Sequence, residues 1–173
     1  MTTNNMDGGK KILIIVDVQK GFITNSNKNM LENINKLLER SHFDRIFATK
    51  FVNLNGGQYQ RFLDWHKMTE SPDIDLAFDE PENLEIIEKH SYALPLDFTQ
   101  RLKQAGSEKV YLCGTDYDAC LLAIGFQLFD MGLQPIFIEN CLGSANNNPM
   151  PLKQFKNIAI RNFGKDCLIK DME

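Results

Sequence analysis

The chain has 173 residues, of which 43% are hydrophobic, and a formal net charge of −4. This length suits a single domain, which buries about 70% of the surface that its unfolded form exposes. The Lys and Arg residues are scattered along the sequence, which argues against a nucleic-acid partner. Every apolar run is far shorter than the ~20 residues that cross a bilayer, which argues against a membrane partner.

The first strand is expected close to the N-terminus. Residues 1–9 are polar and hold two glycines, so they predict a disordered tail, and residues 10–173 then form one domain. Residues 11–16 are apolar without interruption, as in a parallel strand buried on both faces, and Asp17 follows at its end. After a polar loop, residues 30–40 carry apolar side chains at the spacing of an amphipathic helix.

A second strand is predicted over residues 46–52, and the turn-rich residues 53–57 follow it. Further on, Asp64, Trp65 and His66 offer possible metal ligands, but they fall in a segment that we expect to be helical. Neighbouring helical side chains point about 100° apart and do not hold one ion together. The chain also has only 3 histidines and no H-x-x-x-H pair, so we expect no metal site built by the protein.

An acidic segment over residues 70–83 contains two prolines, which predicts a long surface excursion and a possible wall of an active site. Residues 84–88 read as a third strand, with Lys89 at its end. The next helix is expected to have Asp97 as its N-cap and to end at Gly106.

A fourth strand over residues 110–113 runs through a tight turn into a helix that begins near Cys120. Unpaired N–H groups and the helix dipole favour an anion at a helix start, so a thiol there ionises more readily than its reference pKa of about 8.5 allows. The alternative is an inert buried cysteine that only packs. The helix itself is apolar almost all round, which predicts burial against the sheet or another subunit and hence a homo-oligomer, a dimer or tetramer.

The remaining pattern predicts a strand over residues 135–139, a helix over 152–163 and a short strand over 167–169. Cys141 follows a strand instead of opening a helix, so we expect it to pack. None of the 4 cysteines forms a C-x-x-C pair and no secretory signal precedes them, which favours a reducing, cytoplasmic location. Alternating strands and helices predict a three-layer α/β/α sandwich with a mostly parallel six-stranded sheet.

Three charged or nucleophilic residues lie at or just past the ends of predicted strands: Asp17, Lys89 and Cys120. In open α/β sheets the carboxyl ends of parallel strands meet at one edge, where ligands gather. An acid, a base and a thiol are therefore expected to meet there. For Asp17 and Lys89 the alternative is an ordinary ion pair at two strand ends.

Three motifs resemble those of the isochorismatase-like cysteine hydrolases. Residues 17–22 are similar to the D-x-Q-x-x-F opening of this family, residues 89–92 to its K-x-x-Y segment, and residues 114–120 to its G-x-x-T/D-x-x-C turn. The order and spacing of all three motifs agree, and the resemblance extends over residues 11–169. It implies a Rossmann-like α/β fold and an Asp-Lys-Cys catalytic triad.

The resemblance also implies an activity, that of an amidohydrolase that cleaves a C–N bond of a small-molecule amide. Cys120 would attack the carbonyl and form a thioester, Lys89 would favour the thiolate, and Asp17 would carry the proton. The non-proline cis peptide of the family corresponds to Thr115-Asp116, and the backbone N–H groups of Asp116 and Cys120 would stabilise the oxyanion. Candidates for the substrate pocket are Gln19, Phe22, Asn53, Tyr92 and Tyr117.

One departure from the family concerns metal. Metal-dependent nicotinamidases in the family carry a T-R-D-W-H run after the second strand, whose Asp and His help to hold a divalent ion. The matching residues here are Thr49, Lys50, Phe51, Val52 and Asn53. Because the ligands are replaced, we expect neither a metal ion nor another cofactor.

Three other functions compete with amide hydrolysis. Isochorismate hydrolysis is one, although family members that cleave this vinyl ether lack the cysteine. A binding or scaffold protein that kept the fold is another, suggested by unusual residues such as Phe51, Asn53, Leu94 and Pro95. A flavodoxin-like nucleotide binder would need a glycine-rich loop after the first strand, and residues 18–21 lack repeated glycines.

Overall fold

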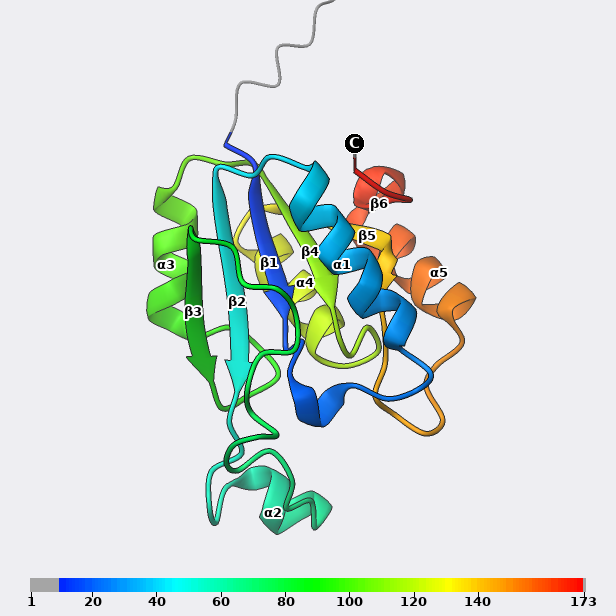
Figure 1. Ribbon diagram of the computed structural model, residues 1–173. Coiled ribbons are helices and arrows are strands. Elements are labelled where there is room, and N and C mark those ends of the chain that lie inside the picture. Colours follow the sequence, from blue (N-terminus) through cyan, green and yellow to red (C-terminus); the bar gives the residue numbers. More distant parts are fainter. Residues whose placement is uncertain (1–9, 173) are drawn as a thin grey trace, which may run out of the picture.

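The computed structural model of the protein describes residues 10–172. The predicted disordered tail, residues 1–9, lies outside the described residues. Within them, a six-stranded sheet is covered by helices on both faces (Figure 1). No helix in this part of the chain is long and apolar enough to span a membrane.

The sheet is parallel throughout, which confirms the predicted six-stranded α/β sandwich and makes it more regular than expected. Its strands lie in the order β3-β2-β1-β4-β5-β6. Their bounds are β1 (Ile12–Val16), β2 (Arg45–Phe51), β3 (Leu84–Lys89), β4 (Lys109–Gly114), β5 (Gln134–Leu142) and β6 (Leu168–Ile169). Every residue of the central strand β1 is buried, as its unbroken apolar run predicts.

Helix α1 covers one face of the sheet, and α3, α4 and α5 cover the other (Figure 1). The helices are α1 (Lys28–Arg40), α2 (Gln58–Leu63), α3 (Leu96–Gln104), α4 (Cys120–Asp130) and α5 (Leu152–Phe163), with single 3-10 turns η1 (Lys20–Phe22) and η2 (Lys165–Cys167). Helix α1 packs through Met30, Ile34 and Leu37, which recur at helical spacing.

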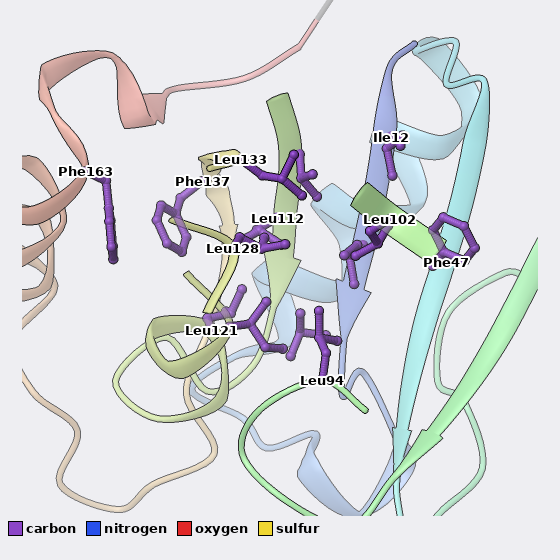
Figure 2. Packing of buried hydrophobic residues seen from close by; sticks show 14 of the residues in the cluster. Ile12, Phe47, Leu94, Leu102, Leu112, Leu121, Leu128, Leu133, Phe137 and Phe163 are labelled. Carbon is purple, nitrogen blue, oxygen red and sulfur yellow. The ribbon is translucent and has the colours of Figure 1, made fainter. Parts of the chain in front are cut away.

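The larger apolar core lies between the sheet and the helices α3, α4 and α5. Figure 2 shows Leu121 and Leu128 of α4 beside Leu112 of β4, in the same cluster of buried residues. The outer side of α4 is different, because Phe126 and Phe129 are 39% and 44% exposed in the single chain. Burial against the sheet therefore accounts for only part of the apolar surface of α4.

Three local predictions are wrong. Helix α2 ends at Leu63 because Asp64 takes a left-handed conformation (φ 51°), so the Asp-Trp-His tripeptide follows the helix instead of lying in it. Strand β5 continues past the predicted end, since Gly114 of β4 pairs with Leu142, and Cys141 therefore lies within the strand. Asp97 lies in the first turn of α3 and makes no capping hydrogen bond; Pro95 occupies the N-cap position.

The excursion between α2 and β3 is held against the loop that follows β1. The main-chain N–H groups of Lys20 and Gly21 donate to the carbonyls of Asp75 and Asp73, at 2.8 and 2.9 Å. Gln19 and Leu76 form an isolated antiparallel bridge. The excursion therefore reaches the carboxyl edge of the sheet, as a wall of a site there requires.

Candidate active site

Asp17, Lys89 and Cys120 come together at the carboxyl edge of the sheet. Asp17 follows β1, Lys89 ends β3, and Cys120 is the first residue of α4. The Nζ atom of Lys89 lies 2.8 Å from Oδ2 of Asp17 and 3.5 Å from Sγ of Cys120. The ammonium group therefore touches both the acid and the thiol.

The Lys89 side chain is long enough to reach from β3 across β2 to Asp17 at the end of β1. Strand β2 lies between β1 and β3, so their backbones are about 9–10 Å apart. The Nζ atom of Lys89 lies over the ring of Phe51, 5.2 Å from the ring centroid, and donates a further hydrogen bond to the Ser91 carbonyl at 2.8 Å. The side chains of Lys89 and Asp17 are 0% and 1% exposed, so the pair is closed to water.

The environment of Lys89 keeps the group charged. Burial alone would lower the pKa of Lys89, but the charge of Asp17 and the hydrogen bonds with Asp17 and Cys120 outweigh burial and raise it, and a thiolate on Cys120 raises it further. Lys89 is accordingly an ammonium group at neutral pH.

The thiol of Cys120 behaves differently from the sequence expectation. Burial, followed by the charge of Asp17, raises the pKa of Cys120 well above its ordinary value, and the opposing effect of Lys89 is smaller. A helix start therefore does not yield a freely ionised thiol here, because burial removes the solvation that a thiolate needs. The resting state is a protonated thiol next to a carboxylate, and ionisation requires transfer of the proton.

Asp17 is placed to receive that proton. Its Oδ2 atom is buried and, apart from the ion pair with Lys89, accepts no hydrogen bond of favourable geometry. Its Oδ1 atom accepts a hydrogen bond of 2.6 Å from the hydroxyl of Thr49 on β2. Sequence reasoning named Thr49 only as the match to the Thr of the family's T-R-D-W-H run and gave it no role, because nothing in its position on a buried strand distinguishes a structural hydroxyl from one that holds a catalytic group.

The turn before α4 supplies main-chain donors. The peptide bond between Thr115 and Asp116 is cis. Among the described residues, the N–H groups of Asp116 and Cys120 donate to no acceptor, whereas those of Ala119 and Leu121 both donate to the carbonyl of Asp116. The two unpaired N–H groups remain available to an oxygen atom of a ligand.

Two carboxylates of the same turn hold the loop after β5, a role that sequence reasoning did not assign. Asp116 Oδ1 accepts from the main-chain N–H of Ala145 at 2.5 Å, and Asp118 Oδ2 accepts from that of Met150 at 2.9 Å. Burial raises the pKa of Asp116. Both side chains therefore serve to position the turn.

Of the five candidate pocket residues, Gln19 and Tyr117 have other roles. Gln19 is fully buried. Its side-chain amide accepts a hydrogen bond from the main-chain N–H of Phe51 and donates to the carbonyls of Phe51 and Ile74. Tyr117 packs on Phe155 in the core and donates to the Met150 carbonyl at 2.7 Å. Their side chains tie elements together, because all their polar atoms already have protein partners.

Phe22 and Tyr92 belong to an aromatic cluster, defined as Phe22, Phe51, Tyr59, Trp65 and Tyr92. Successive rings lie 5.0–6.3 Å apart, and Tyr92 is 46% exposed at the open end. Burial raises the pKa of Tyr92, and the centroid of the Phe51 ring of the cluster lies 5.2 Å from Lys89 Nζ. The cluster therefore borders the triad; Tyr59 and Trp65 were not expected there.

Asn53, the fifth candidate, is buried. Its Nδ2 atom donates to the carbonyls of Trp65 and Lys67, and its Oδ1 atom has no hydrogen-bond partner among the described residues. Asn53 thus holds the segment after α2 and keeps one buried acceptor unused.

The positions that match the nicotinamidase metal ligands hold no ligand set. Phe51 packs against Tyr59 with ring centroids 5.0 Å apart, and Asn53 bonds main-chain carbonyls. Asp64 and His66 contact each other at 3.0 Å, but both are largely exposed. Within residues 10–172, no three His, Cys, Asp or Glu side chains form a group that could hold a metal ion.

Solved structures share this fold over nearly the whole chain. N-carbamoylsarcosine amidase from Thermoplasma acidophilum has a TM-score of 0.74 and 20% identity, over 90% of this chain and 93% of that one. The pyrazinamidase of Pyrococcus horikoshii, solved in complex with zinc, has a TM-score of 0.71 and 18% identity, over 92% and 97%. Nicotinamidase from Bacillus subtilis has a TM-score of 0.72 and 16% identity, over 93% and 99%.

At these identities the structural likeness shows the fold alone. No curated protein matches the chain in sequence. The family model described as the isochorismatase domain, however, matches residues 11–164, which is most of the chain and includes Asp17, Lys89 and Cys120. The protein therefore belongs to the isochorismatase-like hydrolase family.

Proposed function

We propose that this protein is a cysteine hydrolase that cleaves the C–N bond of a small-molecule amide through a thioester on Cys120. One observation carries the proposal: Lys89 Nζ contacts both the buried Asp17 and the partly exposed Cys120. If Asp17 and Lys89 formed only a structural ion pair, no thiol would be required in contact with the ammonium group. The amidases among the structural neighbours support the same reaction class.

Acylation begins with the protonated thiol. Cys120 Sγ attacks the amide carbonyl carbon while its proton passes to Asp17 Oδ2, and the carbonyl oxygen becomes an oxyanion. The tetrahedral species collapses, the C–N bond breaks, and Asp17 returns the proton to the leaving nitrogen. Ammonia or an amine departs, and the acyl group remains on Cys120 as a thioester.

Deacylation uses the same groups. A water molecule attacks the thioester carbonyl, Asp17 takes a proton from the water, and a second oxyanion forms. Its collapse breaks the C–S bond, releases the carboxylic acid and restores the thiol with the proton held by Asp17. Lys89 stabilises the negative charge that moves between Cys120 and Asp17 throughout.

The unpaired N–H groups of Asp116 and Cys120 are the proposed oxyanion donors. Removing one such donor costs about 2.7–4 kcal/mol of transition-state stabilisation in other acyl-transfer enzymes. Because both groups belong to the main chain, they are fixed by the turn before α4 and need no rearrangement as charge develops.

Ammonia release from a panel of amides tests the proposal, with nicotinamide, pyrazinamide and N-carbamoylsarcosine in the panel; hydrolysis of isochorismate, which contains no nitrogen, is measured separately. We expect turnover of at least one amide, abolished in Cys120→Ala and kept in Cys167→Ala, a matched change at a buried cysteine outside the triad. EDTA should leave the rate unchanged.

Turnover of isochorismate alone would favour the vinyl-ether hydrolase. Absence of turnover together with an unreactive Cys120 would favour a binding protein. Activity that survives Cys120→Ala would contradict the thioester mechanism.

A further inference from the structure

The hydroxyl of Thr49 makes two contacts with a single residue, Asp17. Thr49 lies on β2, where it pairs with Val16 of β1 on one side and with Ile87 of β3 on the other. It is fully buried, so its hydroxyl bonds only protein groups. Among the described buried polar residues, Thr49 and Lys89 are the two whose side chains contact the proposed base.

The direction of both hydrogen bonds follows from the donors present. The main-chain N–H of Asp17 donates to Thr49 Oγ1 at 3.0 Å, so the hydroxyl oxygen is an acceptor there. The single hydroxyl hydrogen then points at Asp17 Oδ1, 2.6 Å away. Thr49 therefore holds the main chain and the carboxylate of Asp17 at once.

The backbone conformation and the carboxylate orientation of Asp17 both require support from neighbouring residues. Its φ of 52° lies in the left-handed region, which is unfavourable for a residue with a side chain and persists only where the surroundings impose it. With Oδ1 occupied by Thr49, the carboxylate cannot rotate without breaking a charge-assisted hydrogen bond. The oxygen left for Lys89 and for the thiol proton is Oδ2.

We propose that Thr49 is a positioning residue of the site: its hydroxyl fixes the Asp17 carboxylate so that Oδ2, and not Oδ1, faces the Cys120 thiol. The proposal rests on the proposed function, in which Asp17 accepts the thiol proton. It goes further by assigning the orientation of the base to a side chain on a neighbouring strand.

Alkylation of Cys120 by iodoacetamide tests this without a substrate. Asp17 and Lys89 are the charged groups next to the thiol, and the phenols of Tyr59 and Tyr92 also face it, so the alkylation rate at neutral pH depends on transfer of the thiol proton to Asp17. Thr49→Val keeps the shape of the side chain and removes the hydroxyl. We expect its rate at pH 7 to fall by about 10-fold to 100-fold, the usual value of a hydrogen bond to a charged group.

Two variants separate positioning from simple stability. Thr49→Ser keeps the hydroxyl and should keep the parent rate and its pH dependence. Thr99→Val removes another buried hydroxyl, which donates to the Leu96 carbonyl in α3, and should leave the rate unchanged. Melting temperatures of all three show how much stability each change costs.

The outcomes are decisive. A parent-like or faster rate in Thr49→Val overturns the proposal, as does a Thr49→Ser rate as low as that of Thr49→Val. If Thr49→Val does not fold, Thr49→Ala takes its place, and failure of both to fold shows that Thr49 serves the fold. Failure of the proposed function gives a different result: the parent protein turns over no amide, while the alkylation rate of Cys120 still falls in Thr49→Val.

Discussion

Lys89 and Asp17 are favourable in their buried setting only as a pair. Burial removes the hydration of each charge. The attraction between the two charges, together with the hydrogen bonds to Ser91 and from Thr49, offsets this desolvation cost. Removal of one partner leaves the other buried and uncompensated. The pair therefore ties the stability of the fold to the chemistry of the site.

Lys89→Met tests this coupling at the residue scale. The change should lower the free energy of unfolding by about 3–5 kcal/mol, because Asp17 is left without its counter-ion. Since Lys89 is the group that lowers the pKa of Cys120, its loss should also shift the alkylation of Cys120 to higher pH. Urea unfolding and alkylation rates measured against pH check both effects.

Lys156→Met is the matched control, because Lys156 pairs with Glu139 in a partly exposed ion pair. Such a pair contributes at most about 1 kcal/mol. Superimposable alkylation curves for the parent and Lys89→Met would show that Lys89 does not tune the thiol.

The site was predictable from the sequence in part. Strand-end positions and motif spacing suggested where Asp17, Lys89 and Cys120 would lie, because the carboxyl ends of parallel strands share one edge. The protonation state of Cys120 was not predictable, since it depends on how much water the folded chain excludes. The role of Thr49 was hidden for a similar reason: it depends on the register between β1 and β2.

At the scale of elements, the close approach of β4 to β1 brings Cys120 towards Asp17. Gly114 ends β4 with φ of 116°, and a Cβ atom built there would lie 2.2 Å from the carbonyl oxygen of Val16. The next N–H, that of Thr115, donates to the same carbonyl at 2.9 Å. Only glycine allows the two strand ends to come so close.

Gly114→Ala should therefore lower the free energy of unfolding by at least about 4 kcal/mol, a loss typical of severe backbone or packing conflicts. Gly106→Ala is the control: Gly106 also has a positive φ, 74°, but its Cβ would meet no atom within 4 Å. That variant should lose only about 1–2 kcal/mol, from backbone strain. Equal losses in urea unfolding would show that close approach contributes nothing at Gly114.

Most elements were predictable because their apolar periodicity determines them. The errors occur where tertiary pairing or backbone conformation determines the end of an element. Strand β5 runs to Leu142 because β4 offers a partner there, which the sequence after residue 139 does not reveal. Helix α2 ends at Leu63 because Asp64 turns left-handed, and a helical pattern of apolar residues continues beyond it. Pairing and backbone conformation overrode the local pattern in both cases.

On the scale of the whole molecule, α4 and α5 present an apolar face. Phe126 and Phe129 pack against Phe163 with ring centroids 5.0 and 5.6 Å apart, yet remain 39% and 44% exposed. Ile160 of α5 is 43% exposed. We expect this face to lie between subunits of a homo-oligomer, because contiguous exposed apolar patches mark interaction sites.

Phe126→Glu should therefore lower the molar mass measured by light scattering from that of an oligomer to that of the monomer. Phe62→Glu, on α2, removes an even more exposed phenylalanine, at 75%, and should leave the mass unchanged. A monomeric parent protein at micromolar concentration would contradict the assignment of this face.

The order of the strands has a consequence for synthesis of the protein. Ile12 of β1 pairs with Arg45 of β2 on one side and with Val110 of β4 on the other. Since a ribosome synthesises the chain from its N-terminus, the edge of β1 that pairs with β4 stays unpaired until β4 has emerged. Such an edge is a template for aggregation, and long-range parallel pairing is slow. A nascent chain stalled before Lys109 therefore exposes the strand that leads to Asp17, and chaperone binding would matter most during that interval.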